Sequence, residues 1–274
     1  MLKIREQLAE TLPVLKDIEK PKVGIILGTV LSSLIDKIDI KGRIPYSEIP
    51  HFAKPTVESH TGELIHGRLS GVPVVALKGR FHFYEGYDMK TITYPVRVIK
   101  ALGAETLVVS NVSGGLNPLY SMGDIVMIAD HINLTGDNPL RGANDDELGV
   151  RFPDMSDAYT KELRDLAVRV SVEKKIPIKQ GVYIGLMCPN LETAAEYRFV
   201  RRIGADCVGM STVPEVIVAV HAGLKVLGFS IITDMCLPDN LKPATLEEIL
   251  KVANGTDNKL SELIAEVFKE FTED

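Results

Sequence analysis

The chain has 274 residues, of which 45% are hydrophobic and 25% are charged, and its formal net charge is −6. This length and composition are those of a globular protein that can bury a sizeable core, as one large α/β domain or two small ones. The negative charge argues against nucleic acid as the main partner, because phosphate-backbone binding requires a concentrated basic surface, so any anion site must be local.

Hydrophobic periodicity predicts the first elements of the chain. The first 20 residues follow a helical period that Pro21 closes, and their frequent charges indicate a helix rather than a signal peptide. A buried strand at 23–27 ends in Gly28-Thr29 before a helical pattern, which makes a plausible anion cradle without a P-loop or dinucleotide fingerprint. Residues 40–62 are rich in Pro, Ser, His and Gly, and predict an irregular loop carrying His51 and His60.

The remaining predicted elements are strands and helices that alternate along most of the chain. Two strands, 63–69 and 72–78, are joined at Ser70-Gly71 with hairpin spacing. Further strands are predicted at 106–110, 125–129, 181–186, 206–208 and 226–232, and helices at 89–102, 157–173, 193–203, 213–222 and 245–271. This alternation predicts an α/β fold of one domain over residues 1–274, with a mixed, mostly parallel central sheet flanked by helices.

Chemically rich residues follow the strand ends. The stretch Gly79–Gly86 combines a guanidinium, an imidazole, a phenol and a carboxylate between two glycines, which suits a polyanion and a hydroxylated ligand, or else simply covers the sheet edge. The small residues Asn111–Gly115 read either as an anion-binding nest or as an ordinary turn. The long loop 130–156 is typical of a functional or interfacial segment.

Six strand ends together indicate one crevice, because ligands bind outside the carboxyl ends of strands in such sheets. They are those at Thr29, Arg80–Glu85, Asn111–Gly115, Pro189–Glu192, Met210-Ser211 and Thr233-Asp234. The cationic and hydroxyl side chains at these strand ends can bind phosphate. The acidic side chains, which have apolar neighbours, suit a flat heterocycle. The sequence has no metal-ligand spacing, no CxxC and no GxSxG, and its three scattered cysteines favour a reducing cytosol. Phosphate itself is therefore the expected nucleophile.

Several long motifs resemble the trimeric purine nucleoside phosphorylase family. They are GRFHFYEG (79–86), NVSGGLNP (111–118), DHINLTGDNPLRGANDDELGVRFPDMSDAY (130–159) and VGMSTVPEV (208–216). The resemblance implies reversible phosphorolysis of a purine ribonucleoside to the free base and ribose 1-phosphate, in purine salvage. It also implies a homotrimer in which the 130–156 loop reaches a neighbouring active site through Leu148. A cytoplasmic location is expected from the composition and the charged N-terminal helix. It implies no cofactor beyond phosphate as co-substrate, and no run approaches the roughly 20 apolar residues that would span a membrane.

The same resemblance assigns the site residues. Phosphate is expected on Thr29, His60, Arg80, His82, the Val112 backbone and Ser211. Ribose is expected on Tyr84 and Met210, and the base on Leu191, Glu192, Val208, Thr233 and Asp234. His82, Glu192 and Asp234 are the expected catalytic groups. Phosphate held under the sugar would stabilise positive charge on ribose, and a donor at the purine would stabilise negative charge there.

The chain departs from the family pattern at three places. Val30 and Ser32 replace glycines of the first loop, and Asp234 replaces the asparagine of enzymes that act on 6-oxopurines. Asp234 can donate only when it is protonated, through burial or a nearby Glu192, and if ionised it would accept from a 6-amino group instead. Leu246 stands where a histidine usually reaches the 5′-hydroxyl.

These departures leave two alternatives open. The apolar residue at 246 resembles the pattern of the methylthioadenosine phosphorylases. Against this, Cys236 stands where those enzymes have a second aspartate, and Glu192 matches the nucleoside phosphorylases. The other alternative, from a different class, is a non-enzymatic purine or phosphate binder.

Overall fold

The computed structural model of the chain describes residues 3–28, 32–53, 62–187 and 189–272. Its helices are α1 (Ile4–Thr11), α2 (Ser32–Ile35), α3 (Met89–Ala101), α4 (Lys161–Glu173), α5 (Ala194–Arg202), α6 (Val213–His221) and α7 (Leu246–Lys269). Its strands are β1 (Val23–Leu27), β2 (Ile38–Pro45), β3 (Glu63–Leu69), β4 (Val72–Lys78), β5 (Thr106–Gly115), β6 (Ile125–Asn133), β7 (Ile178–Gly185), β8 (Cys207–Gly209) and β9 (Lys225–Met235). Short 3₁₀ turns lie at Leu12–Leu15, Tyr46–Glu48, Phe83–Glu85, Pro238–Asn240 and Glu270–Thr272.

The strands form one nine-stranded mixed sheet in the order β2-β3-β4-β1-β5-β8-β7-β6-β9. An additional pairing of β5 with β9 closes its second half on itself. The pairs β1–β4, β1–β5, β5–β9, β6–β7 and β7–β8 are parallel, and the other pairs are antiparallel. The predicted α/β class with a mixed central sheet is therefore confirmed.

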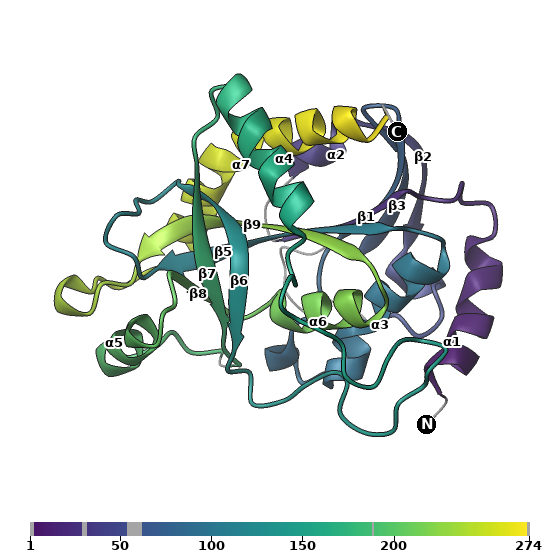
Figure 1. The fold of residues 1–274 in the computed structure, drawn as a ribbon, viewed down its shortest axis with the longest axis horizontal. Helices are drawn as coiled ribbons and strands as arrows, with labels where there is room; N and C mark the ends of the chain where they lie inside the picture. Colours follow the sequence, from purple (N-terminus) through teal and green to yellow (C-terminus); the bar gives the residue numbers. More distant parts are fainter. Residues whose placement is uncertain (1–2, 29–31, 54–61, 188, 273–274) are drawn as a thin grey trace.

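Helices cover both sides of the sheet, with α4, α7 and α2 on one side and α6, α3 and α1 on the other (Figure 1). Strand β1 is buried along its whole length, Val23–Leu27, because both of its faces are covered. The apolar core is correspondingly divided into a large cluster under each set of helices. No helix within the described part of the chain is long and apolar enough to cross a membrane.

Two of the sequence predictions about the sheet are wrong. Part of the expected 40–62 loop is strand β2, whose buried Ile38 begins an alternating pattern of exposure that turn-forming residues obscured. A bulge between Ile40 and Gly42 further breaks its period. The expected nest at Asn111–Gly115 is the second half of β5, which pairs with β9 to its end. Small residues there serve close packing between strands rather than a turn.

Candidate active site

Arg80 lies two residues beyond the end of β4 and is only 4% exposed. Its Nε donates to Glu215 Oε1 over 2.6 Å, and its Nη1 donates to the Ser110 carbonyl over 2.9 Å and to Ser211 Oγ over 3.3 Å. Its Nη2 is buried without a hydrogen-bond partner among the described residues. A buried donor of a cation is costly to leave unpaired, so the arrangement is that of a guanidinium held ready for an anion.

Glu215 of α6 is the residue that fixes this guanidinium. Both side chains of the Arg80–Glu215 pair are almost fully buried, at 2% and 5% exposure. Sequence reasoning missed this role of Glu215, although it lies within the VGMSTVPEV motif. The two partners are 135 positions apart, and no local spacing in the sequence could join them.

His82 and Tyr84 lie beside each other after Arg80. The His82 Nδ1 contacts Glu85 Oε1 at 3.0 Å, and the His82 amide donates to the same oxygen over 2.7 Å. Because an ionised carboxylate only accepts, the His82 tautomer with its proton on Nδ1 is the one that satisfies this contact. The His82 ring stacks on Tyr84 with centroids 4.7 Å apart. Burial raises the pKa of Tyr84 to about 12, so this phenol stays neutral and can donate to a sugar hydroxyl.

Ser211 is presented by a strained turn. The next residue, Thr212, is fully buried and has a positive φ of 70° with ψ of −52°, and the Val213 amide donates to the Ser211 carbonyl over 2.7 Å. These are the values of the rare classic γ-turn. Asn111 stabilises the turn, because its Nδ2 donates to Thr212 Oγ1 over 2.7 Å. Strain of this kind is typical of functional sites, and here it aims Ser211 at Arg80.

A second group of predicted residues gathers around β9. Asp234 accepts from Thr233 Oγ1 over 2.9 Å and from Cys236 Sγ over 3.1 Å. Glu192 is 7% exposed, and its Oε1 is buried without a partner among the described residues. Burial raises the pKa of Glu192, and the nearby charge of Asp234 adds to this effect. Leu191, next to Glu192, is half exposed at 51%.

Gly114 brings the walls of this second group together. A Cβ atom at Gly114 would lie 2.3 Å from Cys236 Sγ, 3.3 Å from Val208 Cγ1 and 3.4 Å from Asp234 Oδ2. Asp234 is also the residue paired with Gly114 in the parallel register of β5 and β9. The predicted base residues Val208 and Asp234 therefore both flank position 114, where a side chain would collide with the Cys236 thiol.

The register of β5 and β8 connects the two groups. Val208 pairs with Gly114, and β8 runs antiparallel to β5. The chain after Val208 therefore runs back along β5 until Ser211 reaches Arg80, which also contacts Ser110. Met210 lies between the two ends and is half buried. The short segment Val208–Ser211 thus links the acidic residues around β9 to the cationic site at Arg80.

Thr29 and His60 lie outside the described residues. Val112 belongs to β5 and pairs with Ile231, so its amide is part of a strand and not of a nest. No cluster of His, Cys, Asp and Glu within the described ranges has the arrangement of a metal site.

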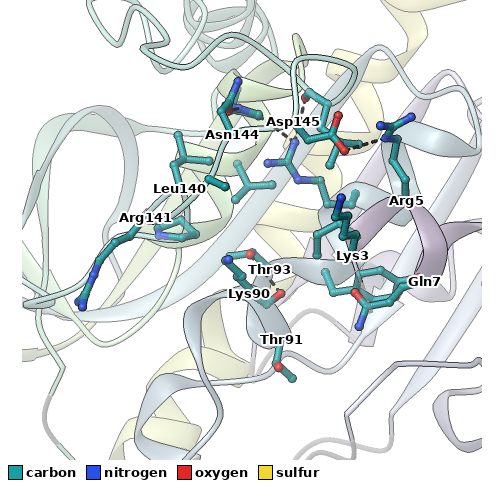
Figure 2. Close-up of a pocket in the computed structure, with 18 of the residues that line it drawn as sticks. Lys3, Arg5, Gln7, Lys90, Thr91, Thr93, Leu140, Arg141, Asn144 and Asp145 are labelled. Atoms are coloured by element: carbon teal, nitrogen blue, oxygen red, sulfur yellow. Dashed lines mark hydrogen bonds and ion pairs between the residues drawn. The ribbon is translucent and has the colours of Figure 1, made fainter. Parts of the chain in front are cut away.

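A separate cavity of about 650 Å³ lies between α1, α3 and the segment 139–148 (Figure 2). Arg5 Nε donates to Asp145 across its rim over 2.7 Å. None of the described residues predicted for phosphate, ribose or base lines this cavity. Leu148 does line it, and packs against the core of its own chain while its carbonyl accepts from Arg97 Nη1 over 3.1 Å.

Comparison with known proteins identifies the family. The profile of the Phosphorylase superfamily matches residues 22–269. Purine nucleoside phosphorylase 1 of Bacillus subtilis is 47% identical over 253 residues, which are 92% of this chain and 93% of that protein. The chain belongs to the purine nucleoside phosphorylase family. It is a pentosyltransferase of that family, as the motifs at the strand ends predict.

Solved structures of family members agree with the fold. Schistosoma purine nucleoside phosphorylase in complex with hypoxanthine superposes with a TM-score of 0.93 at 38% identity, covering 98% of this chain and 99% of that one. The Schistosoma mansoni purine nucleoside phosphorylase in complex with adenosine gives a TM-score of 0.91 at 39% identity, covering 99% of this chain and 98% of that one.

Proposed function

We propose that this chain catalyses the reversible phosphorolysis of purine ribonucleosides, with phosphate bound at Arg80 and the purine bound at Glu192. The observation that carries the proposal is the pair of buried polar atoms without partners, Arg80 Nη2 and Glu192 Oε1. One is a cationic donor and the other belongs to a carboxyl group. They stand at the two ends of the segment that Val208 to Ser211 spans, as a phosphate and a purine on either side of one ribose require.

In the proposed reaction, a phosphate oxygen attacks C1′ of the ribose while the N-glycosidic bond breaks and its electron pair passes to the purine. Arg80 and Ser211 hold the phosphate, together with Thr29, His60, His82 and the Val112 amide. Holding the dianion beneath the sugar stabilises the positive charge that develops on ribose. Tyr84 and Met210 hold the ribose in line with the phosphate.

The purine is held by Leu191, Glu192, Val208, Thr233 and Asp234. A carboxyl group that is protonated at this end donates a hydrogen bond to the purine and stabilises its developing negative charge, in surroundings where burial strengthens the interaction. Residues 189 to 192 come after β7, and Asp234 is the last residue but one of β9, so the ends of two strands supply the recognition of the base. The reaction needs no cofactor beyond phosphate.

The proposal includes a cytoplasmic homotrimer that serves purine salvage. Two apolar side chains of the 130–156 segment are strongly exposed in the single chain, Phe152 at 86% and Val150 at 64%. Exposed apolar side chains of this size suit an interface between subunits.

Base release with and without phosphate tests the function. The protein is incubated with inosine, guanosine and adenosine, and both products are quantified by chromatography. We expect equal amounts of free base and ribose 1-phosphate, and neither product when phosphate is omitted. Binding of purine and phosphate without turnover of any nucleoside would instead establish the non-enzymatic binder.

A second candidate substrate is 5′-methylthioadenosine. Leu246 at the start of α7 is 68% exposed, so its side chain is not committed to the core and can contact an apolar 5′ group. A higher kcat/KM for methylthioadenosine than for adenosine would favour this substrate, and the reverse order would favour ordinary ribonucleosides.

A further inference from the structure

A chain of polar side chains lies behind the strained turn that presents Ser211. Thr212 and Ser230 are fully buried, and Asn111 is 5% exposed. Asn111 Nδ2 donates to Thr212 Oγ1 over 2.7 Å, and Asn111 Oδ1 accepts from Ser230 Oγ. At the outer end, Thr212 Oγ1 lies 3.2 Å from Ser211 Oγ. We call these four side chains, Ser230, Asn111, Thr212 and Ser211, the hydroxyl relay.

The register of the sheet brings the relay together. Asn111 of β5 and Ser230 of β9 are paired residues of parallel strands. Side chains two residues apart share a face of a strand, so Ser113 lies on the same face as Asn111, and Ser113 Oγ contacts Ser230 Oγ at 2.6 Å. The relay therefore connects the interior of the sheet to the proposed phosphate site.

Each hydroxyl group has a single proton, so the contacts of the relay also determine its direction. A phosphate dianion only accepts hydrogen bonds, so Ser211 must donate its own proton to bind phosphate. The proton between Ser211 and Thr212 is then that of Thr212, whose Oγ1 accepts from Asn111. Ser230 fixes this orientation of the Asn111 amide by donating to Oδ1, and its own oxygen accepts from Ser113.

Ser211 is the end of the relay that meets the ligand. It is partly exposed, whereas the other three side chains are buried. Its Oγ accepts from Arg80 Nη1 over 3.3 Å and from Thr212, which uses both lone pairs and leaves the proton for the ligand. A reversed relay would direct that proton to Thr212 and present only a lone pair to the phosphate.

We propose that Asn111 and Ser230 are positioning residues for phosphate, which fix the direction of the hydroxyl relay so that Ser211 donates outward. This inference rests on the proposed phosphorolysis and deepens its phosphate site. Both residues act through Thr212 and Ser211 rather than on the substrate. A buried network whose members are all satisfied is rigid, and it holds the donor in place before phosphate arrives.

Calorimetric titration of inorganic phosphate into the whole chain tests the proposal with a double-mutant cycle. Ser211→Ala should weaken phosphate binding about tenfold, the effect of losing one hydrogen bond to a charged group. Asn111→Leu has a similar size without the amide, and should weaken binding by a similar factor. Added to Ser211→Ala, Asn111→Leu should weaken binding by less than about twofold further, because the hydroxyl through which it acts is gone.

Ser230→Ala and Ser113→Ala are a matched pair, because each removes one hydroxyl of the same contact. Ser230→Ala removes the donor to Asn111 Oδ1 and should weaken phosphate binding about threefold. Ser113→Ala keeps that donor and should leave phosphate affinity unchanged. Both variants lose one buried hydrogen bond and should lower the melting temperature, so a merely structural role would affect them alike.

Equal factors for Asn111→Leu with and without the Ser211 hydroxyl would overturn the proposal, and so would equal phosphate affinities of Ser230→Ala and Ser113→Ala. If Asn111→Leu does not fold, Ser230→Ala takes its place in the cycle. Failure of the proposed phosphorolysis has a different signature. The protein would then release base from no nucleoside, while the pattern of phosphate affinities across the variants would remain.

Discussion

Replacing Arg80 with lysine isolates the geometry of the phosphate site from its charge. Arg80 has donors to spare: Nε contacts Glu215 Oε1, Nη1 contacts Ser110 and Ser211, and Nη2 has no described partner. Lysine has a single nitrogen, which cannot hold Glu215 and phosphate in the same way. Losing one hydrogen bond between charged groups costs about 1.5–3 kcal/mol, which corresponds to a rise of about 10- to 150-fold in the KM for phosphate.

Initial rates of base release over a range of phosphate concentrations measure this KM, at saturating nucleoside. The matched control is Arg68→Lys, because Arg68 is an exposed arginine that pairs with Glu19 on the surface. We expect the control to leave the KM for phosphate unchanged. A folded Arg80→Lys variant that saturates with phosphate as the unaltered protein does would remove Arg80 from the phosphate site.

Three further predictions concern stability. Glu215→Ala should lower the free energy of unfolding, measured in urea, by about 3–5 kcal/mol, because it leaves the charge of Arg80 buried and unpaired. A loss below about 1 kcal/mol would contradict the assignment of Glu215 as the buried partner of Arg80. Burial and the charge of Arg97 lower the pKa of His221, so the unfolded chain binds the proton more tightly than the folded chain, and stability should fall as the pH drops below about 6.5. The His221→Asn variant should therefore lose less melting temperature between pH 7 and pH 5 than the unaltered protein. An identical loss in both proteins would refute this cause. Gly149→Ala should destabilise the 139–149 segment by several kcal/mol, since its Cβ would lie 1.9 Å from the His221 carbonyl at a φ of 146°; unchanged protease resistance of this segment would show that the strain is absent.

The fold was largely predictable because most of its strands have clear hydrophobic patterns in the sequence. Runs such as Val23–Leu27 are buried on both faces and form continuous apolar segments in the sequence. Thr245 and Glu248 form a capping box at the start of α7, where the helix was predicted to begin. Strand β2 was missed because it is an exposed strand with a bulge at Gly42, and its polar residues are typical of loops. The first helix ends at Thr11 rather than near Pro21, since Pro13 follows in a 3₁₀ turn.

The sequence predicts residue types for the site but not the connections between them. Strand ends pointed to Arg80, Glu192 and Asp234, whereas their partners depend on pairings between distant segments. Glu215 reaches Arg80 only because α6 begins at the γ-turn of Thr212, and no pattern in the sequence signals a turn at a threonine. Contacts of this kind require the register of the sheet, which periodicity alone does not fix.

A crystal structure of the protein with phosphate and adenine bound tests the central claim most directly, because it locates both ligands relative to the two unpartnered atoms. The account predicts a phosphate oxygen within hydrogen-bonding distance of Arg80 Nη2 and the purine edge within the same distance of Glu192 Oε1. Phosphate bound away from Arg80, or a purine that leaves Glu192 Oε1 without a contact, would contradict it.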